Sequence, residues 1–429
     1  MNNAFALVDC NNFYCSCERA FNAALHNKPV LVLSNNDGCV VARSNEARAL
    51  GIRMGQPAFE CRELIEQHAI QVFSSNYSLY ADMSDRVMKT LATFTSRLEV
   101  YSIDEAFLDV SHVGAEHLLD YGRQIRETVW QCTGIPVSVG LATTKTLSKI
   151  ATEVVKQNPP SQGVLNLTHY SEAELDELLD SIALKDVWGI GPRYTNRLQA
   201  SRNIFTAKNL KDADEHWIRK RFSVMVQRTV LELRGIACIP LETEPKPKKG
   251  IMTAKSFGRP VESLAELEEA VATYTARAVE KLRNQESAAC CISVFLTTNP
   301  FQHDAPQYAN SLSRMLPFPT SFTPDFLNVA LDLVRSMYQP GFRYKKAGVC
   351  ISKIVSQEVL QADLFGDYSL EREYKKARLM AMVDFINRWW GQNTIFFGAQ
   401  GIGQEWKMRQ ERRSPRFTTQ WGEILVVRT

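Results

Sequence analysis

The feature that most constrains the fold is a pair of adjacent acidic residues inside an apolar segment. In YSIDEAFLDV, residues 101–110, Asp104 and Glu105 stand between residues typical of a buried strand. Ionised carboxylates in such surroundings are costly unless they are paired or bind a metal. Residues alternate between the two faces of a strand, so a straight strand would point the two acids apart. A tight turn brings both to one edge, and the sequence therefore predicts a hairpin with the acids at its tip.

The length of the chain predicts more than one domain. A single core usually stops growing at about 250–300 residues, and this chain has 429. No apolar run approaches the ~18 residues of a membrane helix, and MNNAFALVDC lacks the charged start and long apolar core of a signal peptide. We expect a cytoplasmic protein with no membrane partner. Ten cysteines without CxxC spacing and seven scattered histidines favour reduced thiols over a zinc site.

The first 165 residues alternate between strand-like and helix-like patterns. Ser44 and Gly51 flank a short helix as its N-cap and its C-terminal stop. The other expected strands are residues 4–9, 28–34 and 136–142, and the other expected helices are residues 78–98, 118–130 and 143–157. This pattern predicts an α/β unit with Asp9 at the end of its first strand.

The middle of the chain is basic. Residues 185–259 contain 16 Lys or Arg against 7 Asp or Glu, although the net charge of the whole chain is only +3. Such a segment suits a polyanionic partner, and the alternative is a solvated helical surface. Residues 171–235 have helical patterns, and the linker LETEPKPKKG follows. A third region shows strand-like CCISVFLTT and AGVCISKIV around a helical AELEEAVATYTARAVEKLRN.

Three carboxylates are the candidates for chemistry. Asp9, Asp104 and Glu105 are expected at the ends of strands that can neighbour one another. Converging carboxylates suit Mg²⁺, and two such ions can promote an in-line displacement at phosphorus. The alternative is that each acid pairs with a Lys or Arg; for the three together we favour metal. Arg48 and Lys156 can reach a triphosphate as charged clamps.

Several motifs together resemble the Y-family DNA polymerases, the translesion enzymes. ALVDCNNFYCSCE, SNEARALGI, SIDEAFLDV and SVGLATTKTLSKIATEVVKQNP occur in the order and spacing of that family. KPVLVLSNNDGCVVARSNEARALG and SSNYSLYADMSDRVM are similar to its UmuC branch, the catalytic subunits of bacterial DNA polymerase V. The likeness extends to FFGAQGIGQEW and SPRFTT near the C-terminus, and thus covers nearly the whole chain.

The resemblance implies a multidomain α/β and α+β protein with the right-hand polymerase fold. The implied domains are a palm (1–20 and 75–165), fingers (21–74), a helical thumb with a helix-hairpin-helix (166–240), a linker (241–250), a little finger (251–356) and a C-terminal tail (357–429).

The resemblance also implies the roles of the site residues. Asp9, Asp104 and Glu105, with the Cys10 carbonyl, would bind two Mg²⁺ ions as the catalytic metal ligands. Two further features concern the incoming nucleotide.

The first of these features is the steric gate. Tyr14 matches the position whose ring collides with a ribose 2′-hydroxyl, and Phe13 is the competing candidate. The second is the triphosphate site, which Arg48 and Lys156 match. Asn45 stands where many members carry a tyrosine that also contacts the triphosphate, so the resemblance does not supply that contact here.

Contacts with DNA and with a sliding clamp are implied by three further segments. In WGIGPRYTNRL, Gly189 and Gly191 would let backbone amides approach a DNA phosphate, with a plain helix–helix turn as the alternative. The little finger would offer DNA-binding cations, and QADLF resembles the clamp-binding pentapeptide. The residues concerned are Lys248, Lys249, Lys255 and Arg259 for DNA, and Gln361, Asp363, Leu364 and Phe365 for the clamp.

The predicted function is error-prone translesion DNA synthesis in DNA damage tolerance and SOS mutagenesis, by two-metal nucleotidyl transfer. The resemblance implies as partners primer–template DNA, dNTPs, the sliding clamp, a processed UmuD-like dimer and a recombinase filament, with nucleoid association when the protein is bound to DNA. Two other classes are a non-catalytic DNA- or clamp-binding scaffold and a palm-type nucleotide cyclase. The cyclase would leave the basic middle, the helix-hairpin-helix and QADLF unexplained.

Overall fold

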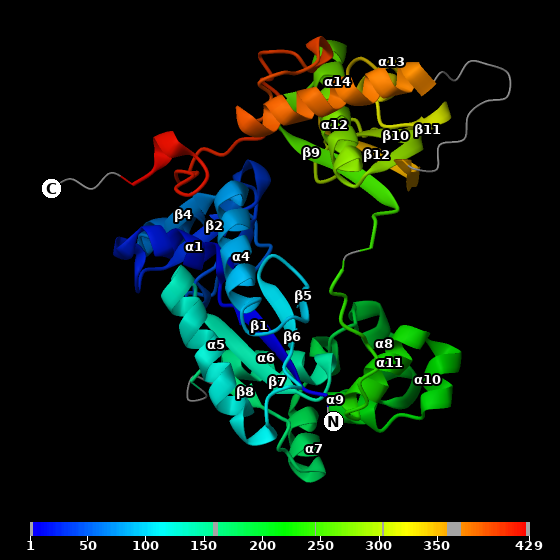
Figure 1. Cartoon of the computed structure of the whole chain (residues 1–429). Coiled ribbons are helices and arrows are strands. Elements are labelled where there is room, and N and C mark those ends of the chain that lie inside the picture. The colour runs from blue at the N-terminus through cyan, green and yellow to red at the C-terminus, as the bar shows by residue number, and fades with distance from the viewer. Residues whose placement is uncertain (1–2, 158–161, 245, 303, 358–369, 426–429) are drawn as a thin grey trace. The chain divides into compact units, whose positions relative to one another are not determined.

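The computed structural model describes residues 3–157, 162–244, 246–302, 304–357 and 370–425 (Figure 1). The chain forms two compact units. Unit 1 comprises Met1–Ser34, Gly38–Pro245 and Arg412–Thr429, and unit 2 comprises Asn35–Asp37 and Lys246–Glu411. The expectation of more than one domain is thereby confirmed. In the described residues, no helix is both long enough and apolar enough to span a bilayer.

A five-stranded sheet forms the centre of unit 1. Its order is β5-β6-β1-β7-β8; β1 runs antiparallel to both neighbours, and β7 and β8 are parallel. The predicted hairpin is confirmed, because β5 and β6 pair across a turn that contains Asp104. The bounds are Phe5–Cys10 (β1), Leu98–Val100 (β5), Glu105–Asp109 (β6), Val137–Ala142 (β7) and Val164–Asn166 (β8).

Helices cover both faces of this sheet. Alternation along β1 directs Ala6, Val8 and Cys10 into one core, which they share with residues of α4 and α5. Phe5, Leu7 and Asp9 lie on the opposite face, against which α6 packs. Gly140 of β7 leaves room for this helix, because a Cβ atom at residue 140 would lie 2.3 Å from the Ser148 carbonyl oxygen. The helices are α1 (Phe13–Phe21), α4 (Tyr77–Leu91), α5 (Leu118–Thr133) and α6 (Lys145–Gln157).

A three-stranded sheet lies elsewhere in unit 1. Its order is β3-β2-β4, formed by Val40–Arg43, Val30–Leu33 and Gln71–Ser74. The short helix α2 (Asn45–Ala49) begins where predicted, because the Ser44 hydroxyl accepts a hydrogen bond from the Ala47 amide. Gly51 follows it with a positive φ of 87°, which confirms the predicted stop. Helix α3 spans Arg62–Gln67.

The expected helical region is confirmed in the rest of unit 1. Its helices surround a second core of unit 1, to which α6 also contributes Leu147, Ile150 and Ala151. They are α7 (Glu172–Ser181), α8 (Pro192–Arg202), α9 (Ala207–Lys211), α10 (Glu215–Arg221) and α11 (Val224–Leu233).

Unit 2 is a four-stranded antiparallel sheet with two helices packed on it. The order is β11-β10-β12-β9, and α12 and α13 share its core. The predicted strands in CCISVFLTT and AGVCISKIV and the helix between residues 264 and 284 are present, whereas β9, β11 and α13 were not predicted. The bounds are β9 Gly250–Val261, α12 Leu264–Asn284, β10 Ser287–Thr297, β11 Ala309–Thr320, α13 Thr323–Met337, β12 Tyr344–Ser356 and α14 Leu370–Trp389. QADLF lies outside the described residues.

Candidate active site

Strand register brings two of the predicted acids together. Asp9 and Glu105 are directly opposite each other on the antiparallel strands β1 and β6. Opposite residues project from the same face with Cβ atoms about 4.5–5.5 Å apart. Both side chains therefore face α6, and Asp9 is only 5% exposed.

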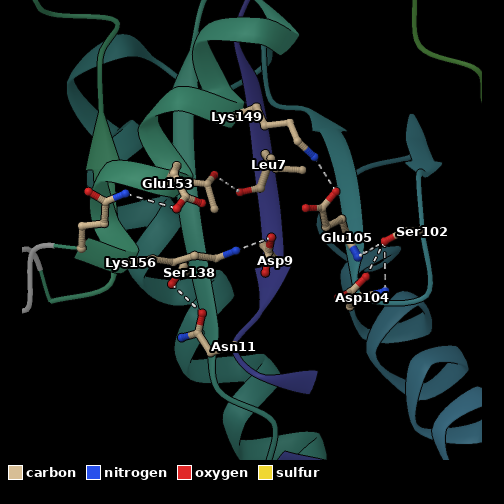
Figure 2. Close-up of polar contacts among 12 residues, drawn as sticks. Leu7, Asp9, Asn11, Ser102, Asp104, Glu105, Ser138, Lys149, Glu153 and Lys156 are labelled. Atoms are coloured by element: carbon tan, nitrogen blue, oxygen red, sulfur yellow. Dashed lines mark hydrogen bonds and ion pairs between the residues drawn. The ribbon is translucent and has the colours of Figure 1, made fainter. Parts of the chain in front are cut away.

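Two lysines of α6 neutralise these acids. Lys156 Nζ lies 2.7 Å from Asp9 Oδ2, and Lys149 Nζ lies 2.7 Å from Glu105 Oε2; both contacts are drawn as dashed lines in Figure 2. The lysines are seven residues apart, about two helical turns, so they lie on one face of the helix. Burial raises the pKa of Asp9 to about 7, although Lys156 acts to lower it. Burial also opposes ionisation of Glu105, but its interactions with Asp9 and Lys149 outweigh this effect and lower its pKa.

The third acid stands at the hairpin tip. The Ser102 hydroxyl donates to Asp104 Oδ1 at 2.6 Å and accepts hydrogen bonds from the amides of Asp104 and Glu105 at 3.2 and 3.0 Å. This small loop fixes the turn. Asp104 is also joined to β1, because its carbonyl accepts a hydrogen bond from the Cys10 amide at 2.8 Å.

All three acids line one pocket, with a volume of about 670 Å³. Arg48 and Lys156 line it as well, so the structure gathers the predicted triphosphate ligands around the carboxylates. No carboxylate of the described residues pairs with the Arg48 guanidinium. Asn45 also lines the pocket, where its side-chain oxygen accepts a hydrogen bond from the Asn12 amide group at 3.1 Å.

The two candidate gate rings differ in their surroundings. Phe13 is 4% exposed and belongs to the hydrophobic core. Tyr14 is half-buried and stacks on Tyr80 with ring centroids 4.4 Å apart and planes 14° apart. Tyr77 meets Tyr14 edge-on at 6.2 Å. Both candidates line the pocket, and Tyr14 has the more accessible ring.

The chemistry of the donors suits a hard cation, although the described residues contain no group of three or more His, Cys, Asp or Glu side chains placed to hold a metal ion. The candidate ligands are all oxygens, as Mg²⁺ prefers. Lysine ammonium groups provide the counter-charge for Asp9 and Glu105 in this structure. Two-metal binding at these acids therefore stays a prediction.

Sequence reasoning missed several contributors to this site. Lys149 holds Glu105, and Ser102 organises the hairpin tip. The available signal for Lys149 was its spacing of seven residues from Lys156 in a predicted helix. Nothing in the sequence alone marked Ser102, because its role depends on the turn.

The predicted DNA-binding residues do not line the pocket of the three acids. Gly189 has φ 84°, and Gly191 is the N-cap of α8, with no atom within 4 Å of where its Cβ would be. Lys248 and Lys249 are exposed. Burial lowers the pKa of Lys255, and the positive charges of Arg277, Lys281 and Lys407 lower it further. Arg259 is held by Glu266 and Glu405 at 2.5 and 3.0 Å, which makes it the weakest candidate of the set.

Comparison with family models gives three matches along the chain. The impB/mucB/samB family matches residues 8–153, and its C-terminal domain matches residues 248–364. A domain of unknown function matches residues 377–427.

Curated proteins and solved structures are similar over most of the chain. Protein UmuC of Salmonella typhimurium is 43% identical over 99% of this chain and 100% of its own length. Protein ImpB of Salmonella typhimurium is 41% identical over 99% of each chain, and DNA polymerase IV of Bacillus velezensis is 24% identical over 94% of each. A Y-family DNA polymerase chimera superposes with a TM-score of 0.64 at 21% identity, covering 82% of this chain and 99% of its own. The predicted polymerase fold is thereby confirmed.

Proposed function

Because the chain belongs to the impB/mucB/samB family and has the fold of the Y-family DNA polymerases, we propose that it carries out error-prone synthesis opposite damaged template bases. The enzyme is a DNA-directed DNA polymerase. One observation carries the proposal: a single pocket is lined by the three acids, by Arg48 and Lys156, and by Tyr14. This is the set of groups that nucleotidyl transfer to a primer requires.

Asp9, Asp104 and Glu105, together with the Cys10 carbonyl, would hold two Mg²⁺ ions. Such ions would supply activation of the primer 3′-hydroxyl and stabilisation of the charge on the departing pyrophosphate. The ammonium groups of Lys149 and Lys156 neutralise two of these carboxylates in the structure. With cations bound at these carboxylates, both ammonium groups would be released from them, and Lys156, which lines the pocket, would contact phosphate oxygens.

Arg48 and Lys156 bind the triphosphate of the incoming dNTP. The Arg48 guanidinium is exposed at the pocket and offers paired N–H donors to phosphate oxygens. Tyr14 packs against the deoxyribose and excludes a 2′-hydroxyl by steric collision. Phe13 supports it from the core.

Backbone amides near Gly189 and Gly191 and the side chains of Lys248, Lys249 and Lys255 bind phosphates of the primer–template. These contacts position DNA without reading its sequence. QADLF recruits the sliding clamp, the C-terminal region binds a processed UmuD-like dimer, and a recombinase filament activates the complex in the SOS response. These partner assignments rest on the resemblance alone.

Single-nucleotide primer extension opposite an abasic site tests the proposal. The assay contains Mg²⁺ and dNTPs, with and without sliding clamp and processed partner. We expect extension past the lesion, and a loss of at least about 100-fold in Asp104→Ala, which removes a metal ligand. Primer–template affinity should stay unchanged in that variant.

Asp120→Ala is the matched control, because Asp120 is an exposed acid of α5 outside the pocket. Extension by Asp104→Ala at the wild-type rate would refute the active-site assignment. Absence of extension in every partner combination, with DNA binding intact, would instead favour a non-catalytic scaffold.

A further inference from the structure

A short C-terminal segment packs against α1, the end of β4 and the start of α4 in unit 1. We call residues 412–417 the C-terminal strap. Arg412 joins the end of β4, because its amide donates to the Ser74 hydroxyl at 2.9 Å and its carbonyl accepts from the Ser74 amide at 3.1 Å. At the other end of the strap, Phe417 stacks on Phe21 of α1, with ring centroids 4.9 Å apart and planes 13° apart.

Ser414 connects the strap to two helices at once. It is 7% exposed. Its hydroxyl donates to Glu18 Oε1 of α1 at 3.0 Å and accepts from the Asn76 side-chain amide at 2.9 Å. Asn76 also donates to the carbonyls of Ser414 and Pro415 at 3.0 and 3.1 Å. The side-chain oxygen of Asn76 caps α4 by accepting from the Leu79 amide at 3.4 Å.

The same contacts continue to the gate ring. Glu18 lies four residues after Tyr14, so both side chains project from the same side of α1. The Tyr80 hydroxyl donates to Glu18 Oε1 at 2.7 Å, and the Tyr80 ring stacks on Tyr14. Glu18 Oε1 therefore accepts hydrogen bonds from both Tyr80 and Ser414. A continuous set of buried contacts runs from the strap to the ring that faces the pocket.

We propose that Ser414 is a positioning residue for Tyr14, and that the strap thereby sets how strongly the polymerase rejects ribonucleotides. A steric gate discriminates only if its ring cannot move aside, because a small displacement creates room for a hydroxyl group. Without Ser414, Glu18 loses one of its two donors, and the Tyr80 ring behind Tyr14 loses its fixed anchor. The inference rests on the proposed function and gives a role to part of the segment that matches a domain of unknown function.

The test is sugar selectivity in the full-length chain, measured as kcat/KM for a dNTP divided by kcat/KM for the matching rNTP. We expect Ser414→Ala to lower this ratio roughly 3- to 10-fold, because a buried hydrogen bond behind the ring is lost, with kcat for the dNTP changed less than about twofold. Both kcat/KM values are measured on one protein preparation, so any fraction of inactive protein lowers them equally and does not change their ratio. Tyr14→Ala removes the gate ring and therefore gives the ratio for an enzyme without a steric gate.

Two further variants separate positioning from stability. Thr418→Val is the matched control, since the buried Thr418 hydroxyl has no hydrogen-bond partner among the described residues; the ratio should stay at the wild-type value. Glu18→Gln retains the oxygen that accepts from Tyr80 and Ser414, so it should preserve selectivity, whereas Glu18→Leu should lower it. Melting temperatures are recorded for each variant.

The outcomes distinguish the inference from the function on which it rests. A lower ratio in Ser414→Ala and Glu18→Leu, but not in Thr418→Val or Glu18→Gln, supports the inference. An unchanged ratio in Ser414→Ala, with a low ratio in Tyr14→Ala, overturns it and leaves the polymerase assignment intact. Equal losses with both nucleotides in Ser414→Ala also overturn it, as a purely structural effect. A wild-type chain that is inactive in every partner combination refutes the proposed function itself.

Discussion

At the scale of single residues, α6 explains why two carboxylates can lie side by side on paired strands. Lys149 and Lys156 contribute one ammonium group to each acid. Burial of an unpaired ionised carboxylate would be costly. Burial raises the pKa of Asp9, while Asp9 and Lys149 lower the pKa of Glu105, so the two acids ionise in different pH ranges.

Lys156 is predicted to act mainly in nucleotide binding. Lys156→Met keeps much of the side-chain volume but removes the charge, so the triphosphate loses a charge-assisted contact. We expect the KM for dNTP to rise about 10- to 100-fold in steady-state primer extension. Lys89→Met is the control, because Lys89 is an exposed cation of α4 paired with Asp85. An unaltered KM in Lys156→Met would remove this lysine from the triphosphate site.

At the scale of elements, α1 and α4 are coupled through a buried acid. Burial raises the pKa of Glu18, while hydrogen bonds from Tyr80 and Ser414 act to lower it. The folded protein therefore binds a proton at Glu18 more tightly than the unfolded chain does. The contribution of this proton binding to the free energy of unfolding is complete below the unfolded-state pKa of Glu18. It is lost as the pH rises through the folded-state pKa.

The raised pKa of Glu18 predicts how the stability of the fold depends on pH. Glu18→Gln cannot ionise and retains the accepting oxygen. The melting temperature of Glu18→Gln minus that of the wild type should therefore increase between about pH 5 and about pH 8, as measured by thermal unfolding. In Glu177→Gln, a change at an exposed acid of α7, the difference should stay flat. A flat difference in Glu18→Gln as well would show that Glu18 has the same pKa in both states.

Elements were predictable where their signal is local. The cap at Ser44, the hairpin at residues 101–104 and the apolar spacing of α4 to α6 each depend on a few neighbouring residues. β9, β11 and α13 were missed. The mostly exposed β11 lacks a clear alternation of apolar and polar residues, since most of its residues face solvent and pairing with β10 holds it in place.

At the scale of the whole molecule, the chain passes from unit 1 to unit 2 and its last residues return to unit 1. The sequence reading treated residues 357–429 as one tail. The structure divides them, because α14 belongs to unit 2 and the strap belongs to unit 1.

Recruitment by a sliding clamp is a prediction for the whole molecule. A tethered enzyme has a high effective concentration at the primer end. Replacement of Leu364 and Phe365 by Ala should leave extension without clamp unchanged and abolish stimulation by the clamp in a processivity assay. Phe301→Ala is the control, because Phe301 is 86% exposed in unit 2 and lies outside the motif. Full stimulation of the double variant would show that QADLF is not the clamp-binding motif.

The sequence by itself determined the strands and helices with strong local patterns, the acidic trio and the family likeness. These signals lie in adjacent residues or in ordered motifs, so they can be recognised without knowledge of the tertiary structure. Only the tertiary structure decided that Asp9 faces Glu105, that Lys149 neutralises it, and that Ser414 reaches Glu18 across 396 positions of sequence. Such contacts depend on strand register and on the return of the chain to its first unit, and neither leaves a periodic mark in the sequence.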